Sequence, residues 1–105
     1  MQNQEPQNYK AKNDREKNLA EAFTKVNTTQ EGLNFLRDLL TPVEFEEFSN
    51  RFEIAKLLET KKLSYAEIAK KVGTSTTTVT RVALWLNNGC GGYKNVLSKF
   101  KKIIY

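Results

Sequence analysis

The residues with the most evident chemistry lie between Ser64 and Arg81, where hydroxyl and basic side chains alternate with apolar ones. Five threonines and one serine occupy positions 74–78 and 80, and a pair of lysines lies shortly before them. Hydroxyl groups form hydrogen bonds with phosphates and base edges, and lysine attracts phosphate by its charge. These residue types, closely spaced, are typical of noncovalent binding to nucleic acid.

Two short helices would position these side chains. Ser64 and Glu67 have the spacing of a capping box, which predicts a helix start, and Gly73 can adopt the left-handed conformation that ends a helix. A second helix follows, and its start carries the hydroxyl groups. Ala69 is small where the helices approach each other, and apolar side chains form the wedge between them: Ile68, Val72, Val79 and Val82. The pattern predicts a helix-turn-helix over about 64–87, a motif that places its second helix in the DNA major groove. An ordinary pair of core helices is the alternative.

The charge of the chain is unevenly distributed over its 105 residues, whose net charge is +5. Residues 1–25 carry five basic and four acidic side chains (+1), and residues 26–50 carry one basic and five acidic (−4). Residues 51–105 carry eleven basic and three acidic side chains (+8). The positive half contains the helix-turn-helix pattern, where attraction to phosphate would assist binding to DNA.

Several function classes are disfavoured by composition. The chain has no histidine and one cysteine, Cys90, so a disulfide within the chain is impossible and a His/Cys metal site lacks ligands. Cys90 could sense redox state or cross-link two subunits, or be a small loop residue. We expect no enzymatic activity and no cofactor, because no nucleophile has an evident base. No apolar run reaches the length of about 18 residues that spans a membrane, and the N-terminus lacks a signal-peptide core. We therefore expect a cytoplasmic, nucleoid-associated protein.

The rest of the chain is expected to be helical as well. A polar tail over 1–13 precedes a single helical domain over 14–105. Apolar spacing predicts helices over 14–26, from about Glu31 to Leu40, over 42–60 and over 93–104. The helix 42–60 has two apolar faces: Phe45, Phe48, Phe52, Ala55 and Leu58 on one, Ile54 and Leu57 on the other. A short domain has too few helices to cover both faces, so we expect a second subunit to do so.

From Leu39 to Leu86 the sequence strongly resembles the bacterial Trp repressor family. The resemblance lies in Leu39-Leu40-Thr41-Pro42 with Glu44, in Arg51, Ile54 and Leu57-Leu58, and in Ser64, Glu67, Gly73 and Thr78-x-Thr80-Arg81. It implies an all-α fold of six helices with a helix-turn-helix, in an intertwined homodimer. It also implies binding to double-stranded DNA at palindromic operators, one recognition helix to each half-site.

The resemblance also marks an effector pocket, with two departures. Thr41, Arg51 and Arg81 align with residues that hold tryptophan in the family. Val82 and Trp85 replace a glycine and a serine there, which removes free volume that a close-fitting ligand needs. We hypothesise that tryptophan is not the corepressor and that the effector is another small molecule or none. The Trp85 indole could fill the space itself, or could be a core or dimer-contact residue; the arginines could be surface or phosphate-contacting residues.

Recognition of DNA should differ from the family as well, because Ala66 and Ala69 align with polar residues that reach bases. We therefore expect the threonines of the second helix to contact the bases and the residues around them to contact the DNA backbone. The candidate DNA-contacting residues are Tyr65, Lys70, Lys71, Thr74, Ser75, Thr76, Thr77, Thr78 and Thr80. The alternative is a solvated helix start, since threonine is a good cap. We expect a sequence-specific transcriptional regulator that acts as a repressor; the alternative is a protein-interaction module that lost sequence-specific binding.

Overall fold

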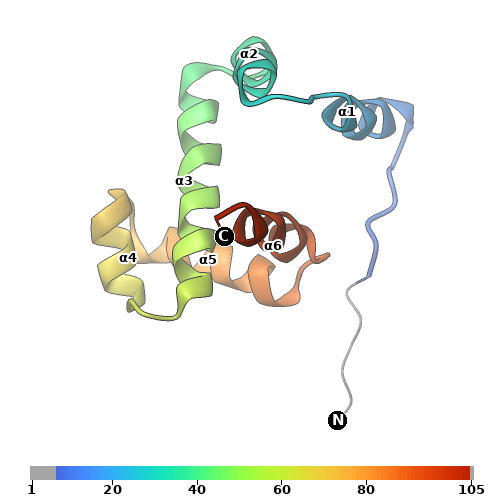
Figure 1. The fold of residues 1–105 in the computed structure, drawn as a ribbon. Coiled ribbons are helices and arrows are strands. Elements are labelled where there is room, and N and C mark those ends of the chain that lie inside the picture. The colour runs from blue at the N-terminus through green and yellow to red at the C-terminus, as the bar shows by residue number, and fades with distance from the viewer. Residues whose placement is uncertain (1–6, 105) are drawn as a thin grey trace. The chain divides into compact units, whose positions relative to one another are not determined.

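A computed structural model describes residues 7–104, with side chains described through Phe100; residues 1–6 of the expected tail lie outside this range. The described chain contains helices and no strand, so the all-α prediction is confirmed. The helices are α1 (Asp14–Thr24), α2 (Thr29–Leu39), α3 (Pro42–Thr60), α4 (Tyr65–Val72), α5 (Thr76–Asn88) and α6 (Gly92–Ile104) (Figure 1). They fall into two compact units, one of which comprises Tyr9–Glu47 and the other the residues from Phe48 on.

The Tyr9–Glu47 unit holds α1, α2 and residues 42–47 at the start of α3. Asn13 and Thr28 cap the two helices by accepting hydrogen bonds from the backbone N–H groups of Glu16 and Glu31, at 2.9 and 3.1 Å. The Phe23 and Phe35 rings meet edge to face, with centroids 5.4 Å apart. Neither helix contains a buried residue. This unit therefore has very little hydrophobic core of its own.

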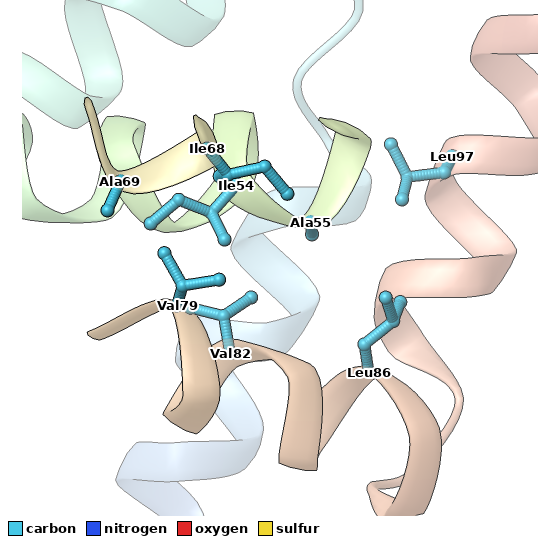
Figure 2. Packing of buried hydrophobic residues seen from close by; sticks show 8 residues of the cluster. All are labelled: Ile54, Ala55, Ile68, Ala69, Val79, Val82, Leu86 and Leu97. Carbon is cyan, nitrogen blue, oxygen red and sulfur yellow. The ribbon is translucent and has the colours of Figure 1, made fainter. Parts of the chain in front are cut away.

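The unit that begins at Phe48 contains the hydrophobic core. Its buried cluster draws residues from four helices: Ile54 and Ala55 of α3, Ile68 and Ala69 of α4, Val79, Val82 and Leu86 of α5, and Leu97 of α6. Figure 2 shows these side chains converging between the helices. The core therefore joins α4 and α5 to the C-terminal half of α3 and to α6.

Helix boundaries follow the capping signals of the sequence. Thr41 and Glu44 form the expected reciprocal pair at the start of α3, since each side chain accepts from the other residue's backbone N–H, at 3.1 and 2.9 Å. Ser64 and Glu67 form a complete capping box before α4. The prediction was wrong by two residues at the end of α1, which stops at Thr24, because the Lys25 N–H turns back to the carbonyl of Ala22.

Gly73 ends α4 in the left-handed conformation, with φ +87° and ψ +39°. We expect Gly73→Ala to lower the free energy of unfolding by about 1–2 kcal/mol, because a Cβ is strained in this region of backbone space. Apart from the residues next to Gly73 in the chain, no atom of the described residues lies within 4 Å of the added Cβ, so the loss would come from the backbone and not from a clash.

Urea denaturation of Gly73→Ala would measure this loss, with Gly73→Asn as the control. Asparagine tolerates the left-handed region better than alanine, so Gly73→Asn should lie between alanine and wild type. Equal stability of the alanine variant and the wild type would contradict the assigned role of Gly73.

Candidate nucleic-acid interface

Helices α4 and α5 are joined by a three-residue turn, and together they form what we call the reading head (residues 64–88). The backbone N–H groups of Gly73 and Thr74 both donate to the carbonyl oxygen of Ala69, at 2.8 and 2.9 Å. Ser75 then caps α5 by accepting from the N–H of Thr78 at 3.1 Å. The short turn, the glycine at the end of α4 and the serine cap of α5 are the connection typical of a helix-turn-helix.

Some of the hydroxyl groups expected to contact DNA already form hydrogen bonds within the chain, and others do not. The Ser75 and Thr78 hydroxyls lie 3.1 Å apart and bond to each other, and Thr78 is half-buried. Thr80 donates its hydroxyl proton to the carbonyl oxygen of Thr76 at 2.9 Å. Thr76 and Thr77 are exposed, and their hydroxyls bond to nothing in the part of the chain that the structure describes. The first turn of α5 therefore presents two free hydroxyl groups.

The buried residues of α5 identify the opposite face of the helix as the one exposed to solvent. Val79, Val82, Ala83 and Leu86 of α5 are buried. Figure 2 shows Val79, Val82 and Leu86 directed into the core between helices. Thr77, Thr80 and Arg81 are exposed and follow the i, i+3, i+4 spacing of a single helix face. Two threonines and one arginine therefore share the solvent face of the recognition helix.

On α4 the exposed candidates are Tyr65, Lys70 and Lys71, whereas the two alanines differ from each other. Ala66 is exposed, but Ala69 is only 5% exposed and belongs to the buried cluster. Ala69 therefore cannot serve as a DNA-facing position in this chain, because a larger polar side chain would have no room there. Thr74, in the turn, is half-buried.

The electrostatics of the reading head favour an anionic partner. Helices α1, α2, α3 and α4 each carry an acidic residue in the first turn, whereas α5 and α6 carry none. The positive end of the α5 dipole is therefore not offset by a carboxylate. Glu67 is the one acidic residue of 64–88, and its side chain accepts from the Ser64 N–H at 2.8 Å. Lys70, Lys71 and Arg81 make the segment positive overall.

The residues aligned with an effector pocket have the following surroundings. Thr41 caps α3. The Arg51 guanidinium lies over the Phe48 ring, 5.4 Å from its centroid, and Arg81 is exposed. Val82 is 4% exposed and belongs to the core, whereas Trp85 is 62% exposed in the single chain. The branched residue at 82 is therefore a packing residue. The indole is not enclosed within its own chain.

Gly89 has a structural role that the sequence alone did not reveal. Its N–H donates to the Trp85 carbonyl oxygen at 2.9 Å and ends α5. A Cβ at Gly89 would overlap that carbonyl oxygen and crowd the Trp85 ring. The Asn88-Gly89 pair is a turn signal that indicates a helix end. It does not indicate that Gly89 lies so close to Trp85.

The chain is similar to known proteins along most of its length. The family described as Trp repressor protein matches residues 15–101. An uncharacterised protein of Bacillus subtilis (strain 168), YerC, is 31% identical over 84 residues, which cover 80% of each chain.

Two crystal structures have the same fold. A TrpR-like protein from Eubacterium eligens ATCC 27750 is 34% identical with a TM-score of 0.78, over 86% of this chain and 92% of that one. A candidate Trp repressor from Staphylococcus aureus is 28% identical with a TM-score of 0.78, over 86% of this chain and 89% of that one. The helix-turn-helix, the fold and the extent of the family match agree, and this chain belongs to the Trp repressor family.

Proposed function

We propose that this protein is a sequence-specific transcriptional repressor that binds a palindromic DNA operator as a homodimer. The observation that carries the proposal is the exposed first turn of α5, where Thr76 and Thr77 have free hydroxyls and no carboxylate offsets the helix dipole. Helix N-termini of this kind bind phosphate, and hydroxyl side chains contact base edges. We infer that regulation acts by occupying the operator and so blocking polymerase.

The homodimer is supported by apolar surface that the single chain leaves exposed. Neither α1 nor α2 has a buried residue, yet they expose Leu19, Phe23, Leu33 and Leu39. Isolated helices of this length, eleven residues each, are marginal in water unless an apolar face packs against another element. A second copy of the chain would supply that element, and sedimentation equilibrium would measure the stoichiometry.

Independence from tryptophan is supported by the position of Val82. In the family a glycine stands at the position of Val82 and leaves room for the ligand, whereas Val82 packs with the core. To make room for a ligand at this position, the Val82 side chain would have to leave the buried cluster, which is unfavourable. Isothermal titration calorimetry of the protein with tryptophan should therefore detect no binding at micromolar concentration, and binding at that strength would contradict the proposal.

A protein-interaction module is the second candidate. Ala66 offers no polar group, Ala69 is buried, and Leu84 and Trp85 expose apolar surface on α5. Exposed apolar patches are typical of protein contacts. The positive charge and free hydroxyls at the start of α5 favour DNA over this alternative.

The decisive experiment is selection from random DNA duplexes by the purified full-length protein, at near-physiological salt and without added small molecules. We expect enrichment of a palindrome with two half-sites about one helical turn apart. A folded dimer that enriches nothing would contradict effector-free, sequence-specific binding. Repeating the selection with tryptophan and with cell extract would then separate a missing effector from lost DNA function.

A further inference from the structure

We propose that Thr77 is the principal base-reading residue and that its methyl group recognises the C5 methyl group of a thymine in each half-site. This inference rests on the proposed DNA-binding function and names the base that the same site reads. It assigns specificity to one side chain among the cluster of hydroxyl residues over 74–80.

The position of Thr77 on α5 is the first step. The core side of α5 is defined by Val79, Val82, Ala83 and Leu86, all buried. Thr77 precedes the exposed residues Thr80 and Arg81 by three and four positions, so it begins the outward face of the helix. A recognition helix contacts bases with its N-terminal residues, and Thr77 lies with Thr76 in the exposed first turn of α5.

The hydrogen bonds of the Thr78 and Thr80 side chains exclude these two threonines from the same role. The Thr78 side chain is half-buried and bonds to Ser75, which itself caps the helix. The hydroxyl proton of Thr80 is donated to the Thr76 carbonyl oxygen. Thr77 keeps both its hydroxyl and its methyl group available for a partner outside the chain.

The side-chain types in this turn select the base. Residues 74–80 include no arginine, lysine, asparagine or glutamine, the residues that read guanine or adenine with paired hydrogen bonds. A threonine methyl instead makes an apolar contact with the thymine methyl, which adenine, guanine and cytosine lack in the major groove. Thymine is therefore the base that this turn can distinguish.

The test removes one methyl group from each partner. In the selected operator, each thymine of both half-sites is replaced in turn by uracil, which keeps base pairing and lacks the C5 methyl. Fluorescence anisotropy then gives the affinity of the wild type, of Thr77→Ser and of Thr78→Ser for each duplex. Thr78→Ser is the matched control, because it loses the same methyl group at a half-buried position on the same turn.

We expect one uracil position to weaken wild-type binding about fourfold per half-site, since a buried CH₂ group contributes about 0.8 kcal/mol and 1.4 kcal/mol is tenfold. Thr77→Ser should bind the thymine duplex about as weakly as the wild type binds the uracil duplex. Uracil at that position should not weaken the binding of Thr77→Ser any further. Thr78→Ser should keep the wild-type response.

Two outcomes would overturn this inference but leave the proposed DNA-binding function standing. One is a wild type that tolerates uracil at every position of a selected palindrome; the other is a Thr77→Ser variant with the full wild-type response. Failure to select any duplex would instead remove the proposed function, and the inference with it.

Discussion

Ala69→Arg is expected to destabilise the protein by about 3–5 kcal/mol, because it places a long charged side chain where the methyl group of Ala69 is enclosed. Ala69 is 5% exposed and packs in the cluster that joins α4 to α5 and α3. Its carbonyl oxygen also accepts the two hydrogen bonds that close the turn after α4. A loss of this size is a large part of the 5–15 kcal/mol typical of a small domain.

Thermal and urea unfolding, followed by circular dichroism at one fixed protein concentration, would measure the effect. The matched control is Ala66→Arg, which makes the same chemical change three residues earlier on the exposed side of α4. That variant should lie within about 0.5 kcal/mol of wild type. It would also add a positive side chain to the surface that we propose contacts DNA. Similar melting of the two arginine variants would contradict the burial of Ala69.

The helices could be predicted from sequence because their ends carry local signals. Ser64 with Glu67, Thr41 with Glu44 and Gly73 each satisfy backbone groups within four residues, and all three adopt the expected geometry. Helix starts and ends of this kind depend on short-range hydrogen bonds. The helix-turn-helix over about 64–87 therefore corresponds closely to α4 and α5.

The degree of burial on each helix was harder to predict, because it depends on contacts between helices. Ile54 and Ala55 are the buried residues of α3, although the sequence placed them on two different apolar faces. Phe48 is exposed despite its size. The packing of α4, α5 and α6 on the C-terminal half of α3 selects these residues. Periodicity identifies apolar faces but does not say which one a neighbouring helix covers.

The binding site could be predicted as a segment and not as individual residues. Nine residues were candidates for DNA contact from their type and their place in the helix-turn-helix pattern. Hydrogen bonds made by their hydroxyl groups, to each other or to the backbone, separate Ser75, Thr78 and Thr80 from Thr76 and Thr77. Such bonds depend on rotamers that no sequence pattern reports. The aligned effector residues Thr41, Arg51, Arg81, Val82 and Trp85 remain a prediction about ligand binding.

Affinity for the selected operator is expected to fall about a thousandfold or more between 50 and 200 mM salt, if the dimer makes at least six phosphate contacts. Each protomer offers Lys70, Lys71 and the uncompensated start of α5 for such contacts. Replacing both lysines by alanine would remove two of the proposed phosphate contacts from each protomer of the proposed dimer. The slope of log K against log salt should then become less steep by about 3–4.

Titrations of the Lys70→Ala, Lys71→Ala variant at several salt concentrations would measure this slope. The matched control replaces Lys56 and Lys94, which carry the same charge on α3 and α6 and pair with Glu53 and Glu59 at 3.8 and 3.3 Å. Their loss changes net charge equally but removes no proposed phosphate contact, and both lysine side chains are more than half exposed. If the two double variants shifted the slope equally, the effect would come from net charge, and α4 would not be the surface that contacts the DNA backbone. A change confined to the α4 variant would place the phosphates at the C-terminal end of α4, beside the turn that positions Thr77 for the bases.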